Sequence, residues 1–379
     1  MRKVVLTTGG TGGHIFPALA VAEELRRRFP AIELLFVGGE YGPESKLAAQ
    51  AGLAYLGLPV RGFLGRGVKA AGAAFSLLKS IGIARKKLKA FGPDLVIGFG
   101  GYAAAASLAA ARLLALPCMI HEQNSLPGLA NRLAGRFAAR VCISLPDAAA
   151  WFKAEKVMLT GNPVRASISR ACSAKQAPAR PVGPISGQVS VQPAGTRRLL
   201  VLGGSQGARA VNSAVLEDLP ALMRDGVSLR LQTGAADYER VAAEIKKYDP
   251  DMPACLPEVS PFIYDMAEAY GWADLVLCRA GATTVAELAV AGLPAVLVPF
   301  PQATHNHQLH NARQVESLGA ALVLEQKDLT PGLAAATIAG LFDDPARLEA
   351  MARAALALAR PDAAARVVDE AARLIEKKP

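Results

Sequence analysis

One unit of sequence constrains the fold of this chain more than any other feature: a short apolar run of strand length, a glycine-rich turn, and a helical segment. The runs are apolar throughout rather than alternating, which is typical of parallel strands buried on both faces. Chains that alternate strands and helices form parallel sheets covered by helices, so the sequence predicts an α/β fold. The glycine-rich segments that follow such runs are residues 9–14, 98–102, 203–209 and 279–281.

The unit at residues 274–308 predicts a site for a phosphorylated ligand. A strand at 274–278 leads through a glycine turn into a helix expected from about Thr284, and a second strand at 295–299 leads into the polar loop 302–308. The first N–H groups of a helix point outward and attract anions. Ligands of parallel sheets bind at the carboxyl ends of the strands, where this turn and this loop both lie.

Two residues in these units have roles that the pattern leaves open. Glu287 lies three residues after Thr284, the spacing of a capping box, so it either caps the helix or accepts hydrogen bonds from ribose hydroxyls. His14 ends the first glycine turn, before a helix expected at 16–28. It either hydrogen-bonds within the loop or acts as a general base, since histidine titrates near neutral pH. The turn is not a dinucleotide-binding motif, because Ile15 occupies the place of the third glycine.

Polar residues also gather at the end of a strand expected at 117–121. His121, Glu122, Gln123 and Asn124 follow one another there. A single histidine at such a position is usually packed and satisfied within the core. Four polar residues together at the carboxyl end of a strand favour contact with a ligand.

Length and composition fit a cytoplasmic protein of two or three domains. The chain has 379 residues, of which 52% are hydrophobic and 6% aromatic, a mix that suits helices packed on parallel sheets. The five cysteines form no CxxC pair, so buried reduced thiols are expected. The N-terminus has too short an apolar core for a signal peptide, and no uninterrupted apolar run has the length of a membrane span.

The net charge of +10 predicts an acidic partner. Nucleic acid is disfavoured, because no nucleic-acid-binding motif occurs and aromatic residues are scarce. Residues 61–91 carry eight basic residues and no acidic one, interspersed with apolar residues. This segment is either an ordinary helix with a solvated basic face or a docking surface for anionic lipid, where each basic residue contributes about 1 kcal/mol. The absence of acidic residues favours the membrane surface.

The chain divides into two β/α halves. Residues 173–197 are rich in Pro, Ala, Gly, Ser and Gln and predict a mobile linker or surface loop. Glycine turns follow strands on both sides of it, which suggests two Rossmann-like domains with a cleft between them. The pair Asp249 and Asp251 matches the metal-binding D-x-D pattern, but it lies in a proline-containing polar loop and is interpreted as a turn. No metal site is predicted.

Six motifs occur in a fixed order over nearly the whole chain. They are GGTGGH at 9–14, GFGGY at 98–102, HEQN at 121–124, GNPVR at 161–165, GGSQGAR at 203–209 and CRAGATTVAELAVAGLPAVLVPFP at 278–301. Together they resemble the MurG family, the bacterial UDP-N-acetylglucosamine transferases of peptidoglycan lipid II synthesis. The last motif is highly specific, whereas any one glycine turn alone would be a weak signal.

The resemblance implies a GT-B fold, in which two Rossmann-like domains with parallel sheets face each other across a cleft. It implies an acceptor- and membrane-binding domain at 1–164, against which a C-terminal helix at about 360–379 packs, and a UDP-N-acetylglucosamine-binding domain at 165–359 that contains a flexible insert at about 173–197. The implied reaction is inverting transfer of N-acetylglucosamine from its UDP donor to the C4 hydroxyl of lipid I, undecaprenyl-pyrophosphoryl-N-acetylmuramyl pentapeptide, giving lipid II. Neither a metal nor a cofactor is implied.

The resemblance also assigns residues to the active site. His14 is the implied base and Glu287 the implied ribose ligand. The other implied donor contacts are Thr11, Gly12 and Gly13 in the N-terminal domain, Asn124 on the sugar, Arg165 and Ser205 on the diphosphate, Ile263 on the uracil, Ala282, Thr283, Thr284, Val285 and Ala286 in the uridine-binding turn and helix, and Gln308 on the sugar. The chain departs from the family in its long 173–197 insert and in His305, His307 and His310, where glutamines or charged residues are common.

The implied partners are UDP-N-acetylglucosamine, lipid I, an anionic membrane surface bound through residues 61–91, and other proteins of cell-wall synthesis, but no nucleic acid. The implied location is the cytoplasmic face of the bacterial plasma membrane, as a peripheral protein that serves cell shape and division. The alternatives are another GT-B transferase with a lipid acceptor, or a noncatalytic nucleotide-sugar-binding subunit. The second is disfavoured because His14 and the donor motif occur on one chain.

Overall fold

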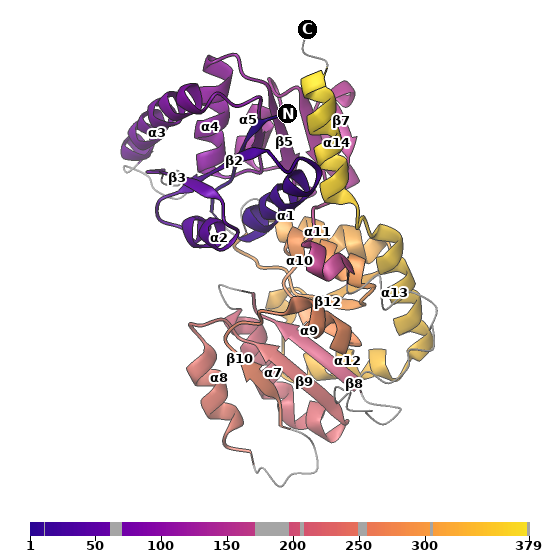
Figure 1. The fold of residues 1–379 in the computed structure, drawn as a ribbon. Helices are drawn as coiled ribbons and strands as arrows, with labels where there is room; N and C mark the ends of the chain where they lie inside the picture. Colours follow the sequence, from indigo (N-terminus) through magenta and orange to yellow (C-terminus); the bar gives the residue numbers. More distant parts are fainter. Residues whose placement is uncertain are drawn as a thin grey trace. The chain divides into compact units, whose positions relative to one another are not determined.

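A computed structural model describes residues 1–10, 12–60, 70–170, 197–204, 208–248, 256–303 and 306–376. The chain forms two compact units (Figure 1). The first unit is Met1–Arg165 together with Arg360–Pro379, and the second is Ala166–Ala359. Both are built on parallel sheets, so the α/β class with two Rossmann-like domains expected from the sequence is confirmed.

The first unit contains a seven-stranded sheet in the order β3-β2-β1-β4-β5-β6-β7. Every neighbouring pair of strands is parallel. The strands are β1 Lys3–Thr7, β2 Glu33–Gly39, β3 Ala54–Leu58, β4 Leu95–Gly98, β5 Cys118–Glu122, β6 Arg140–Ile143 and β7 Val157–Leu159. The helices are α1 Gly12–Arg28, α2 Glu44–Gln50, α3 Ala70–Phe91, α4 Tyr102–Leu113, α5 Leu129–Ala134 and α14 Ala363–Glu376, with short 3₁₀ helices at Pro146–Trp151 and Ala154–Lys156.

Helices cover both faces of this sheet, which explains why its strands are apolar throughout. In β1, Val4 and Leu6 belong to a buried cluster with residues of α1 and α14, whereas Val5 belongs to a cluster with residues of α3 and α4. This alternation follows the two-residue period of a strand. Figure 1 shows the yellow helix α14 beside the indigo helix α1, so the end of the chain completes the core of the first unit.

The second unit contains a six-stranded parallel sheet in the order β10-β9-β8-β11-β12-β13. The strands are β8 Arg197–Leu202, β9 Val227–Gln232, β10 Glu258–Ser260, β11 Leu275–Cys278, β12 Ala295–Leu297 and β13 Ala321–Val323. The helices are α7 Arg209–Arg224, α8 Tyr238–Ile245, α9 Met266–Trp272, α10 Ala282–Ala291, α11 His307–Ser317, α12 Leu333–Phe342 and α13 Pro345–Leu358, with a 3₁₀ helix at Gln326–Asp328.

Each sheet has one point at which its growth reverses direction. From β1 the first sheet extends through β2 on one side and through β4 on the other, and β8 divides β9 from β11 in the same way. The loops at the carboxyl ends of strands on either side of such a point separate and leave room for a ligand. The four glycine-rich turns of the sequence follow β1, β4, β8 and β11, the strands that flank the two reversal points.

Several element boundaries differ from those expected. Helix α1 begins at Gly12 rather than at Phe16 and continues through Pro17, whose missing N–H removes one bond near the start of the helix. Helix α9 begins at Met266, where the Asp265 carboxylate caps it by accepting from the Glu268 N–H at 3.0 Å. Strands β3 and β13 were not predicted, and both are short, with five and three residues.

Three cysteines, Cys118, Cys142 and Cys278, are buried free thiols, as expected. Cys172, Cys255, the Asp249–Asp251 pair and the 173–196 part of the linker lie outside the described residues. Across the described ranges, no helix combines the length and apolar character needed to cross a membrane.

Candidate active site

The two glycine turns of the first unit lie directly against each other. The Gly9 N–H donates to the Gly100 carbonyl oxygen at 3.0 Å, which joins the turn after β1 to the turn after β4. Gly101 adopts φ 87° and ψ 172°, a conformation available essentially to glycine. A Cβ atom there would lie 2.2 Å from the Gly9 carbonyl oxygen. The sequence therefore needs glycine at this point for both conformation and space.

His14 lies in the first turn of α1 and packs onto the second glycine turn. A Cβ atom on Gly100 would lie 2.9 Å from His14 Cδ2 and 3.0 Å from His14 Nε2, so the imidazole fills the space that this glycine leaves. The side chain of His14 is half-buried. The same Cβ position lies 3.5 Å from Asn131 Nδ2, which places His14 beside the polar residues that follow β5.

His121 is fully buried at the end of β5 and is neutral. Its Nε2 lies 3.0 Å from the Gly161 carbonyl oxygen, and its Nδ1 lies 3.1 Å from Gln123 Nε2. These partners assign the proton to Nε2, which donates to the carbonyl, while Nδ1 accepts from the amide. Burial, with a smaller contribution from His14, lowers the pKa of His121 to about 4. His121 is therefore a packed core histidine with both ring nitrogens hydrogen-bonded, as is usual for a single histidine at such a position.

Glu122 organises the turn that carries Asn124. Its buried carboxylate accepts from Asn124 N at 3.0 Å, Asn124 Nδ2 at 3.2 Å, Gly128 N at 3.2 Å and Asn131 Nδ2 at 2.9 Å. Burial raises the pKa of Glu122, and these four donors oppose that rise because they favour the ionised form. Asn124 is thereby fixed by both its backbone and its side chain.

The pH dependence of stability should reveal His121. Its folded pKa of about 4 lies below the ordinary value of about 6.5, so between these values the unfolded chain binds a proton that the folded chain does not. Stability should therefore fall as the pH decreases from about 6.5 to about 4, by up to about 3 kcal/mol. Urea denaturation of the wild type and His121→Asn across this range measures the difference in their free energies of unfolding. Glu122 changes the stability of both proteins with the opposite dependence on pH, and its effect cancels in this difference. If the free energies of unfolding of the two proteins change with pH in the same way, the prediction is contradicted.

In the second unit, α10 begins directly after the turn that follows β11. The helix starts at Ala282, and its N-cap is Gly281, which makes no side-chain capping bond. The predicted start at Thr284 with a capping box is wrong, because a turn of three residues after β11 leaves Thr284 inside the helix. Glu287 is 5% exposed, and its Oε2 accepts from the Tyr270 hydroxyl of α9 at 2.9 Å. The capping interpretation of Glu287 is thus excluded.

The loop after β12 is held by two polar side chains. Arg279 donates through Nη1 to the carbonyl oxygens of Val298 and Pro299 at 3.1 and 3.2 Å, and through Nη2 to Gln326 Oε1 at 2.7 Å. Burial lowers the pKa of Arg279 to about 10. Gln308, in the first turn of α11, accepts through Oε1 from the Phe300 N–H at 3.0 Å.

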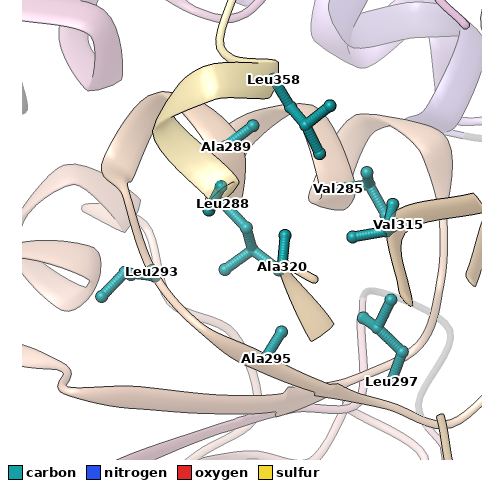
Figure 2. Close-up of a pocket in the computed structure, with 10 residues that line it drawn as sticks. Val285, Leu288, Ala289, Leu293, Ala295, Leu297, Val315, Ala320 and Leu358 are labelled. Carbon is teal, nitrogen blue, oxygen red and sulfur yellow. The ribbon is translucent and has the colours of Figure 1, made fainter. Parts of the chain in front are cut away.

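A small apolar cavity lies against the inner face of α10 (Figure 2). Its volume is about 10 Å³. It is lined by Val285, Leu288, Ala289, Leu293, Ala295, Leu297, Val315, Ala320, Ala355 and Leu358. This space holds one water molecule at most and offers no polar side chain, so it does not bind a nucleotide sugar. The polar groups of α10 lie instead at its N-terminus and at Glu287.

The residues expected in the site fall into two groups, one in each unit. In the first unit, Gly12, Gly13, His14 and Asn124 lie at the carboxyl ends of β1 and β5. Arg165, the last residue of its first segment, holds its guanidinium 5.0 Å from the centre of the Phe16 ring. In the second unit, Ile263 follows β10, Ala282–Glu287 begin α10 after β11, and Gln308 follows β12. Thr11, Ser205 and His305 lie outside the described residues, as do positions 61–69 of the basic segment.

Sequence reasoning missed Gly100, Tyr270 and the function of Glu122 within its motif. Gly100 was visible as part of a glycine turn, but its contact with His14 depends on the pairing of β1 with β4. Tyr270 carried no signal, because a tyrosine in a helix is usually a core residue. Among the described residues, no three His, Cys, Asp or Glu side chains are grouped so that they could hold a metal ion.

Comparison with known proteins identifies the family. Residues 4–143 match the Glycosyltransferase family 28 N-terminal domain, and residues 198–367 match its C-terminal domain. The UDP-N-acetylglucosamine–N-acetylmuramyl-(pentapeptide) pyrophosphoryl-undecaprenol N-acetylglucosamine transferase of Nitratidesulfovibrio vulgaris strain Hildenborough is 56% identical over 379 residues, covering 100% of this chain and 99% of the relative. The protein of the same name from Solidesulfovibrio magneticus is 50% identical over 371 residues, covering 96% and 95%.

A solved structure gives the same result. The crystal structure of Acinetobacter baumannii MurG superposes with a TM-score of 0.74 at 33% identity, covering 100% of both chains. The fold class is therefore GT-B. Because the relatives match along the full length at high identity, this chain belongs to glycosyltransferase family 28 and, within it, to the MurG family of N-acetylglucosamine transferases.

Proposed function

We propose that this protein transfers N-acetylglucosamine from UDP-N-acetylglucosamine to the C4 hydroxyl of lipid I, with inversion at the anomeric carbon, to give lipid II. The observation that carries this proposal is the 56% identity, over the whole chain, to a transferase whose name states this donor and acceptor. The site residues of both units support it, because each group lies at the carboxyl ends of parallel strands where ligands bind.

The second unit binds the donor. The N-terminus of α10 presents N–H groups and a partial positive charge to the diphosphate. Glu287, one and a half turns further along, accepts hydrogen bonds from the ribose hydroxyls. The remaining donor ligands of this unit are Ser205, Ile263, Ala282, Thr283, Thr284, Val285, Ala286 and Gln308.

The first unit binds the acceptor and carries out the proton transfer. His14 removes the proton from the C4 hydroxyl as that oxygen attacks the anomeric carbon. The bond between the anomeric carbon and the UDP oxygen breaks, and the electron pair leaves with UDP. Thr11, Gly12 and Gly13 contact the donor from this unit, Asn124 contacts its sugar, and Arg165 offsets the charge of the departing diphosphate.

Turnover tests the function directly. Purified protein with UDP-N-acetylglucosamine and a lipid I analogue should form the disaccharide product, whereas UDP-glucose should support much slower transfer. Tight binding of UDP-N-acetylglucosamine without turnover would favour a noncatalytic nucleotide-sugar-binding protein. Turnover with a different lipid acceptor, but not with the lipid I analogue, would favour another GT-B transferase.

Tyr270 provides a test of the ribose contact. Its hydroxyl is 2.9 Å from Glu287 Oε2, so Tyr270→Phe removes one donor from a buried carboxylate without changing the shape of the core. We expect the KM for UDP-N-acetylglucosamine to rise roughly five-fold, corresponding to about 1 kcal/mol, with kcat little changed. Tyr264→Phe, at an exposed tyrosine, is the matched control. An unchanged affinity for UDP in a stably folded Tyr270→Phe protein would argue against this use of Glu287.

The protein binds the cytoplasmic face of the plasma membrane as a peripheral protein. Helix α3 supports this proposal, because its exposed side chains include Phe75, Leu78, Lys79 and the basic run 85–87. Helix α4 packs against α3 and α5, and α5 exposes Leu129, Arg132 and Leu133. Apolar side chains surrounded by basic ones are suited to anionic lipid headgroups.

Charge reversal on α3 tests this docking. Lys86→Glu with Lys87→Glu should weaken sedimentation with vesicles of phosphatidylcholine and phosphatidylserine by at least roughly 30-fold, since each basic residue contributes about 1 kcal/mol near such a surface. Raising the salt concentration should weaken binding of the wild type in the same way. Lys246→Glu with Lys247→Glu, on the second unit, gives the same change of net charge and should have a small effect. Equal effects of the two pairs would exclude a specific role for α3.

A further inference from the structure

Glu44 is a buried carboxylate that contacts the first glycine turn. It is the first residue of α2 and is 1% exposed. Its Oε1 accepts from the Gly10 N–H at 3.0 Å and from the Gly39 N–H at 3.4 Å. The carboxylate thus links the loop after β1 to the end of β2.

The residues around this carboxylate leave space for it. A Cβ atom on Gly42 would lie 1.8 Å from Glu44 Oε2, and one on Gly38 would lie 2.8 Å from Glu44 Cβ. The Tyr55 hydroxyl donates to the Gly39 carbonyl oxygen at 2.7 Å and fixes the other side of the loop. Two glycines and a tyrosine therefore shape the space around one side chain.

Holding Glu44 in this space is costly. Its Oε2 is buried and has no hydrogen-bond partner, and no ion pair recorded among the described residues involves Glu44. An incompletely satisfied buried carboxylate costs stability, so a role other than stabilisation would explain its presence. The other oxygen, Oε1, contacts the Gly10 N–H, and this contact indicates the role.

Gly10 lies at the centre of the turn that positions His14. Three successive N–H groups hold this turn: Thr8 N donates to the Val37 carbonyl oxygen at 3.0 Å, Gly9 N to the Gly100 carbonyl oxygen at 3.0 Å, and Gly10 N to Glu44. The first two bonds are made to the backbone, and the third is made to a side chain. Gly10 has φ 100°, and as a glycine it can adopt many other backbone conformations, so the bond to Glu44 restricts its freedom. His14 follows four residues later, in the first turn of α1.

We propose that Glu44 is a positioning residue for the transfer reaction, which fixes the backbone at Gly10, just before α1, and thereby the placement of the His14 imidazole. This inference rests on the proposed function of His14. Glu44 does not touch the substrate. It acts through the turn, so its loss changes kcat more than the affinity for the donor.

Three variants with a matched control test the role in catalysis. Glu44→Ala removes the contact, Gly42→Ala displaces the carboxylate without changing it, and Glu44→Gln keeps an oxygen for the Gly10 N–H. We expect kcat to fall roughly 10- to 100-fold in the two alanine variants, with the donor KM within about three-fold of wild type, and Glu44→Gln to recover most of the rate. Tyr55→Phe loosens the same loop without touching Gly10 and should keep kcat near wild type. Equal losses in Glu44→Gln and Glu44→Ala, or a loss confined to KM, would overturn the proposal.

A second measurement separates this inference from the proposed function. Hydrogen exchange at Gly10, followed in a peptide that covers residues 8–16, should be faster in Glu44→Ala and Gly42→Ala than in the wild type and Tyr55→Phe. Unchanged exchange would overturn the positioning of the turn even in an active enzyme. If exchange is faster in the two alanine variants but the wild type shows no turnover, Glu44 still supports the turn, and the proposed reaction is wrong instead.

Discussion

Replacing His14 by alanine is expected to lower kcat by roughly 100-fold or more while leaving the binding of UDP-N-acetylglucosamine nearly unchanged. The imidazole packs on Gly100 beside the polar residues that follow β5. In the proposed reaction, it is the base that takes the proton of the acceptor hydroxyl. General-base catalysis contributes about 10²- to 10⁴-fold, so removal of the base should cost a factor in this range. Steady-state turnover with a lipid I analogue measures the loss, and titration with the donor measures binding.

The control for this variant is His310→Ala, which removes an exposed histidine from α11. The wild type and this control should share the decline of kcat/KM at low pH that protonation of the base causes, and His14→Ala should lack it. If His14→Ala and the wild type have similar rates, the protein is still a transferase, but His14 is not its base.

Gly101→Ala is expected to lower the free energy of unfolding of the first unit by about 3 kcal/mol or more and to abolish most turnover. The backbone conformation of this residue alone costs a side chain about 1–3 kcal/mol. The added Cβ would also lie 2.2, 2.7 and 2.8 Å from backbone atoms of Gly9, which cannot rotate away as a side chain would. The two glycine turns must then separate, and His14 loses its support. Urea denaturation and turnover measure the two effects.

Gly128→Ala is the matched control, because it adds the same atom to another turn of the same unit. Gly128 has φ −66° and ψ 153°, and a Cβ atom there meets nothing within 4 Å. The backbone N–H of residue 128, which donates to the Glu122 carboxylate, is kept in this variant. Stability close to wild type is expected for this control, and equal stability of the two variants would contradict the steric argument.

The positions of the glycine turns were predictable from the sequence, because they depend on local order along the chain. A strand followed by glycine and a helix fixes which residues lie at the carboxyl edge of a sheet, and the structure places Gly12, Gly13 and Ala282 at such edges. The start of α10 was placed two residues too late, because Thr284 and Glu287 imitate a capping box. Their spacing also suits two residues inside a helix.

The residues that support the site were not predictable, because their contacts depend on which strands become neighbours. Glu44 reaches Gly10 across 34 residues of sequence, and Tyr270 reaches Glu287 across 17. The strand β3 shows the same limit: its sequence AYLGL has little pattern of its own, and pairing with β2 defines it as a strand. Local pattern thus identifies the turns, and tertiary pairing identifies what holds them.

The return of α14 to the first unit affects how this protein is made. Its residues Val367, Val368 and Ala371 fill the core against α1, and its ion pairs Arg28–Asp369 and Arg140–Glu370 join positions 341 and 230 residues apart. A ribosome therefore releases the strands of the first unit long before the helix that covers one face of them. The nascent chain carries exposed apolar surface throughout synthesis of the second unit, which exposes it to aggregation and to chaperones. Premature termination just before α14 would leave that surface permanently uncovered.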